Sequence, residues 1–108
     1  MDLAKAARTF LDDKKAQDIV LLDVHGQSTV TDYYLIATGL SAPHLKALFN
    51  DLQVELKKKG MNCHRKSGEP EGGWMVLDYF DVIIHIFLPE QRTYYALEAL
   101  WEPVPEVG

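Results

Sequence analysis

The segment WMVLDYFDVIIHIFLPEQRTYYALEALW, residues 74–101, constrains the fold more than any other part of the chain. It predicts two strands followed by a helix. Because successive side chains of a strand point to opposite faces, one face of each strand is wholly apolar and belongs against helices. The other face is mixed and carries Trp74, Val76, Asp78, Ile83, His85 and Phe87. This mixed set predicts a half-open sheet face, rich in side chains that anchor binding partners.

The length and composition indicate one globular domain. With 108 residues, 47% of them hydrophobic and 25% charged, the chain is long enough for one core but not for two. We expect the domain to cover residues 1–102. Residues 103–108, which include two prolines, are expected to form a flexible tail because they lack any periodicity.

The charge and cysteine content limit the kinds of partner. A single cysteine, Cys63, excludes an internal disulfide and fits a reducing, cytoplasmic location. The apolar runs are too short to span a bilayer, so no membrane is expected. The net charge of −5 argues against nucleic acid as the main contact and permits a basic protein partner.

The order of predicted elements defines the fold class. The expected elements are a helix over 3–15, strands at 19–24 and 33–40, a helix capped by Ser41 that runs to Gly60, a strand at 62–66, a glycine-rich hairpin loop at 67–73, the two strands described above, and a helix beginning near Pro89. This order predicts an α/β (α+β) domain with a mixed five-stranded sheet and helices mainly on one face.

No motif indicates a metal or a cofactor. The four histidines lack the i, i+4 spacing of a helical metal site, and neither HExxH nor CxxC occurs. His85 is most simply a surface or interface residue. The glycine-rich loop at 67–73 is not followed by a Lys-Ser or Lys-Thr pair, so it is not a phosphate-binding P-loop.

The one enzymatic activity that the sequence suggests is nucleotidyl transfer. Residues 38–41 place a Gly-Leu-Ser turn between a strand and a helix, where such enzymes bind triphosphate. That chemistry also needs two metal-bridging carboxylates on a neighbouring strand, and no Asp-x-Asp occurs. Asp78 and Asp81 are separated by a turn. Ser41 is therefore better read as a helix cap, and we expect no catalysis.

Several segments together resemble the ribosomal silencing factor family, also called Iojap-like. They are DIVLLDV, STVTDYYLIATGLS, the helix ending in KKKG, and WMVLDYFDVIIHIF followed by RTYYALEALW. The resemblance implies a nucleotidyltransferase-like fold without catalytic residues. It also implies binding to the large ribosomal subunit through the protein uL14, where the factor blocks joining of the small subunit and represses translation under nutrient limitation. Organellar relatives are tied to large-subunit assembly.

The chain departs from the family pattern at two places. Family members usually carry Asp-x-Gly-Asp-Val in the hairpin, whereas Phe80 stands here in place of the turn glycine. Phe80 must then adopt a strained left-handed conformation, or the turn must differ. It could also widen the apolar contact patch. The family often reads Glu-Gly before the tryptophan strand, where this chain has Ser67-Gly68 and so lacks the charge.

These considerations predict a protein-binding site on the mixed sheet face. Its residues are Trp74, Val76, Asp78, Asp81, His85 and Phe87. Trp74 is the expected anchor, and the two aspartates are expected to receive basic side chains. The alternatives are a Trp74 buried in the core and turn-capping roles for the aspartates. Two other functions stay open, namely large-subunit assembly and a nucleotidyltransferase remnant that binds RNA or nucleotide. A homodimer closed by this face is also open.

Overall fold

The computed structural model describes residues 2–24 and 31–95. Its elements are α1 (Asp2–Asp13), β1 (Gln17–Asp23), β2 (Tyr33–Thr38), α2 (Ala42–Lys58), β3 (Arg65–Glu69), a 3-10 turn (Pro70–Gly72), β4 (Trp74–Asp78), β5 (Val82–Phe87) and α3 (Pro89–Tyr95). The predicted order of helices and strands is confirmed. The expected tail at 103–108 lies outside the described residues.

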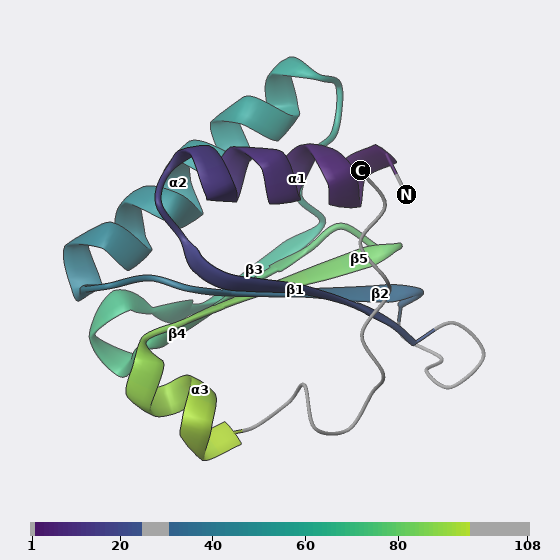
Figure 1. Cartoon of the computed structure of the whole chain (residues 1–108). Helices are drawn as coiled ribbons and strands as arrows, with labels where there is room; N and C mark the ends of the chain where they lie inside the picture. Colours follow the sequence, from purple (N-terminus) through teal and green to yellow (C-terminus); the bar gives the residue numbers. More distant parts are fainter. Residues whose placement is uncertain (1, 25–30, 96–108) are drawn as a thin grey trace.

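The five strands form one mixed sheet in the order β1-β2-β5-β4-β3. The neighbours β1–β2, β3–β4 and β4–β5 are antiparallel, whereas β2 and β5 are parallel. In Figure 1, α1 and α2 lie together on one face of the sheet, and the short α3 lies on the other. The predicted mixed sheet with helices mainly on one face is therefore confirmed.

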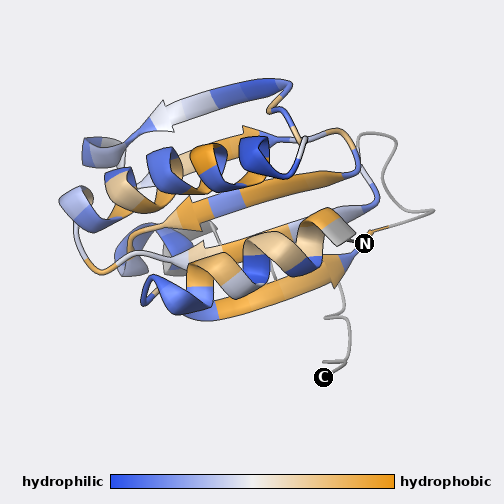
Figure 2. Ribbon diagram, turned by 90° about the horizontal axis from the view of Figure 1, so that it is seen from above, coloured by the Kyte–Doolittle hydropathy of each residue, from blue (hydrophilic) through white to orange (hydrophobic). Residues whose placement is uncertain are grey.

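The main core lies between the sheet and the helices α1 and α2. Helical spacing gives each of these helices one apolar stripe, which Figure 2 shows as alternating hydrophobic and hydrophilic patches along both ribbons. The wholly apolar strand faces supply the other half of this core, as predicted. Its fully buried side chains include Leu11, Leu45, Leu48, Leu52, Leu77, Ile84 and Ile86.

The third strand differs from the prediction. It was expected at residues 62–66, but β3 spans Arg65–Glu69 and so includes Ser67 and Gly68, which were assigned to the loop. All five residues of β3 are exposed, because it is an edge strand. Gly68 has φ +93°, and a Cβ there would lie 2.1 Å from the carbonyl oxygen of Trp74. Only glycine fits at this position.

Arg92 joins the helix α3 to the strands β1 and β2. Its Nη1 atom donates to the Oγ1 atom of Thr38 at 2.8 Å and also to the carbonyl of Asp18. Asp18 lies where the register of β1 against β2 shifts, with φ 47°. One guanidinium therefore fixes α3 against the strand ends. None of the helices in the described ranges is long and apolar enough to cross a membrane.

Candidate functional site

The mixed sheet face lies opposite α1 and α2, as the alternation predicts. Three cross-strand pairs define it, namely Trp74 with Phe87, Val76 with His85, and Asp78 with Ile83. The three residues on β4 are partly exposed, whereas their three partners on β5 are buried. The sequence therefore identified the right residues for one face, but of β4 and β5 only β4 leaves them partly exposed.

An aromatic cluster of Tyr34, Trp74, His85 and Phe87 forms the centre of this face. The Trp74 ring stacks on Phe87 with centroids 5.2 Å apart. The Tyr34 ring meets His85 edge-on at 5.2 Å, and the Trp74 and His85 centroids are 5.8 Å apart. Contacts of this kind stabilise each ring pair beyond the burial of its area. The partly exposed indole of Trp74 is therefore held by two rings from β5, one of which, His85, packs in turn against Tyr34 of β2.

The structure corrects the expected exposure of His85 and Phe87. His85 was expected at the surface or an interface, but it is 8% exposed, and Phe87 is 1% exposed. Both belong to β5, which has β2 on one side and β4 on the other. Larger rings from those neighbours pack against them. His85 and Phe87 therefore pack against Trp74 and expose little surface of their own.

His85 is held as a neutral hydrogen-bond acceptor. The Nε1–H of Trp74 donates to the Nδ1 atom of His85 at 3.0 Å. Burial disfavours the charged imidazolium and lowers the pKa of His85 from 6.5 to about 4. Near neutral pH the imidazole thus carries its proton on Nε2 and accepts at Nδ1. This bond fixes the orientation of the indole.

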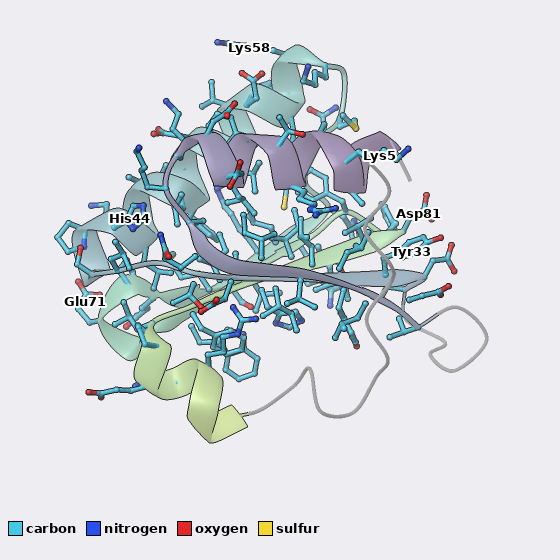
Figure 3. All side chains as sticks on the ribbon, viewed as in Figure 1. Lys5, Tyr33, His44, Lys58, Glu71 and Asp81 are labelled. Carbon is cyan, nitrogen blue, oxygen red and sulfur yellow. The ribbon has the colours of Figure 1, made fainter. Side chains whose placement is uncertain are left out.

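The hairpin between β4 and β5 carries both predicted aspartates at its tip. The Oδ1 atom of Asp78 accepts from the backbone N–H of Phe80 at 2.8 Å, so Asp78 caps the turn, while its binding role stays a prediction. Asp81 is exposed. Its carbonyl accepts from the backbone N–H groups of Asp32 and Tyr33, at 3.2 and 3.0 Å. Figure 3 shows Tyr33 and Asp81 close together at this end of the sheet.

Phe80 adopts the left-handed conformation that its place in the turn demands, with φ 69°. Its ring stacks on that of His64, with centroids 4.0 Å apart and planes 28° from parallel. This contact was missed by the sequence analysis, because it depends on the register of β3 against β4. His64 comes directly before β3, and its backbone N–H donates to the carbonyl of Asp78 at 2.8 Å.

Ser41 and His44 have structural roles at the start of α2. Ser41 caps α2 by accepting from the N–H of His44, which confirms the cap reading. The Nδ1 atom of His44 accepts from the N–H of Leu40, and its Nε2 atom lies 2.9 Å from the carbonyl of Lys14. Figure 3 shows His44 at the start of α2. This histidine therefore joins α2 to the turn after α1.

No potential metal centre is present among the residues that the structure describes, since no three of their His, Cys, Asp and Glu side chains gather together. The thiol of Cys63 donates to the carbonyls of Arg65 and Asp78, at 3.1 and 3.6 Å. Burial raises the pKa of Cys63 above its usual value, which favours the protonated thiol.

Comparison with known proteins identifies relatives over the whole chain. The family model described as "Ribosomal silencing factor during starvation" matches residues 1–108. "Ribosomal silencing factor RsfS" of Bacillus subtilis is 36% identical over 103 residues, which cover 95% of this chain and 87% of that protein. A crystal structure of a Chromobacterium violaceum protein superposes with a TM-score of 0.88 at 37% identity, covering 99% of this chain and 92% of the other.

An organellar relative is also similar. The mouse protein "Mitochondrial assembly of ribosomal large subunit protein 1" is 32% identical over 96 residues, which cover 86% of this chain and 42% of that protein.

Proposed function

The chain belongs to the ribosomal silencing factor family, a family of non-enzymatic ribosome-binding regulators, and from this membership we propose how it acts. It binds the large ribosomal subunit through the protein uL14, on the mixed sheet face. While bound, it occludes the surface that the small subunit must reach. Subunit joining is thereby blocked and translation falls when nutrients are scarce. The protein acts in the cytoplasm and needs no cofactor.

The partly exposed Trp74 is the observation that supports this proposal most strongly. Its ring is stacked on Phe87, and its N–H is bonded to His85. A side chain already held in one orientation loses little entropy on binding, which is a property of interface hot spots. Val76, beside it on β4, extends the apolar area, and Asp78 and Asp81 supply negative charge for a basic partner.

A subunit-joining assay tests the proposal directly. Purified large and small subunits are mixed without nucleotide, with and without the protein, and separated on sucrose gradients. We expect the protein to co-sediment with large subunits and to reduce the fraction of joined ribosomes. Joining that is unaffected at saturating protein would refute occlusion. Inhibition that requires magnesium-ATP or magnesium-GTP would instead support the nucleotidyltransferase remnant.

A second function, large-subunit assembly, is favoured by the similarity to the mouse protein whose name describes it. The two functions can share one binding surface. Depletion of the protein from cells distinguishes silencing from assembly. Accumulation of immature large subunits during rapid growth indicates assembly, whereas normal subunits with excess joining during starvation indicate silencing. Sedimentation of the free protein tests whether the mixed face also closes a homodimer.

A further inference from the structure

Phe80 is an exposed aromatic residue whose side chain contributes little to the stability of the fold. It is 59% exposed, and its φ of 69° lies in the left-handed region. An L side chain is strained there, whereas glycine adopts this conformation freely. A large apolar side chain that is both strained and exposed indicates a role in contact rather than in folding.

The phenyl ring is nevertheless held in place. The backbone of the turn is fixed by Asp78, whose Oδ1 atom accepts from the N–H of Phe80, and by the bond from the N–H of Asp81 to the carbonyl of Tyr79 at 2.9 Å. One side of the ring rests on His64 at a centroid distance of 4.0 Å. The tip of the hairpin thus presents an ordered aromatic surface.

Two carboxylates adjoin this ring on the hairpin, while Arg65 stands opposite Asp78 on β3. Asp78 and Asp81 flank it in sequence, and the backbone N–H of Asp32 donates to the carbonyl of Asp81. A cation over the face of an aromatic ring is attracted by the ring quadrupole, and neighbouring carboxylates add Coulomb attraction. A phosphate group would meet repulsion from the same carboxylates. The acidic hairpin side of the ring therefore fits a cationic side chain better than an RNA backbone.

We propose that the Phe80–His64 stack is a specificity-determining platform that receives an arginine or lysine side chain of a ribosomal protein at the edge of the bound surface. This inference rests on the proposed binding to the large subunit and adds to it a contact beside the mixed sheet face. It assigns a function to an exposed aromatic residue in a left-handed turn position. A variant with glycine there keeps the turn and loses the platform.

Three variants of Phe80 test the platform against purified large subunits. Phe80→Gly is expected to bind at least about tenfold more weakly, while its melting temperature stays unchanged or rises because the left-handed strain is relieved. Phe80→Tyr keeps the ring and should bind within about twofold of the parent. Phe80→Leu keeps apolar area but has no π face, so it should bind nearly as weakly as Phe80→Gly.

The results separate the inference from the function on which it rests. If the parent protein does not bind large subunits, the proposed function itself fails. If the parent binds and Phe80→Gly binds equally well, only the platform is refuted. If Phe80→Leu binds like the parent, the contact is apolar and the cationic partner is wrong.

Cross-linking identifies the class of partner. With p-benzoylphenylalanine in place of Phe80, irradiation of the complex with purified large subunits should join the chain to a ribosomal protein. The exposed Arg65 and Lys66 follow His64 in β3 and would suit a phosphate group. A cross-link to ribosomal RNA alone would therefore overturn the proposal.

Discussion

Acidification should destabilise the protein through His85, and the size of the effect follows from its burial. The pKa of this imidazole is lowered from 6.5 to about 4 because burial disfavours the charged form. Between these values the unfolded chain binds a proton that the folded chain does not. The stability that neutral His85 contributes is therefore fully present above pH 6.5 and is lost as pH falls toward 4. The shift corresponds to about 3 kcal/mol at about 1.4 kcal/mol per unit, with about 2 kcal/mol lost between pH 7 and pH 5.

Urea denaturation at a series of pH values measures this loss. Carboxylates and other histidines also titrate in this range, so a matched variant is needed. His85→Gln cannot titrate, yet its amide oxygen can accept from the indole N–H of Trp74. We expect the variant to be less stable than the parent at pH 7 and to lose about 2 kcal/mol less between pH 7 and pH 5. Equal losses in the two proteins would show that His85 is not held neutral by burial.

Three further outcomes are expected from substitutions on and beside the site. Trp74→Ala should weaken binding to large subunits about 30- to 1,000-fold, from a typical hot-spot cost of about 2–4 kcal/mol, and Trp74→Phe should lose less. A collapse of thermal stability in Trp74→Ala would show that the indole serves mainly the fold rather than binding. Asp81→Lys should weaken binding, most strongly at low ionic strength. Asp78→Asn keeps an oxygen for the turn and loses only the charge. An affinity that is independent of salt would contradict the binding role of both aspartates. Tyr79→Phe should stabilise the fold by about 1 kcal/mol in thermal denaturation. The reason is that, among the described residues, the Tyr79 hydroxyl is a buried polar group without a hydrogen-bond partner. A lower melting temperature of the variant would argue against this reason.

The fold was largely predictable because apolar periodicity is a strong signal in most of its elements. The strand faces of β4 and β5 and the cap at Ser41 followed from side-chain alternation and local hydrogen-bonding preference. The strand β3 was misplaced because RKSGE has neither alternation nor apolar residues, as is usual for an exposed edge strand. The positive φ of Gly68 could have been suspected only from its pairing with β4.

The site was only partly predictable, because exposure depends on tertiary contacts. The sequence placed Trp74, Val76 and Asp78 on the open side, and the structure leaves all three partly exposed. It could not show that His85 and Phe87 are buried, since their covering rings come from neighbouring strands. The binding role of each of these residues remains a prediction.

The two aromatic contact elements differ in how closely they are tied to folding. Trp74 is stacked on the buried Phe87 and bonded to His85, so its removal also leaves a buried acceptor without its donor. Phe80 touches the exposed ring of His64 and sits on a strained backbone, so its removal costs the fold little. A loss of binding in a Trp74 variant must therefore be corrected for lost folding, whereas the same loss in Phe80→Gly reports on the bound surface alone.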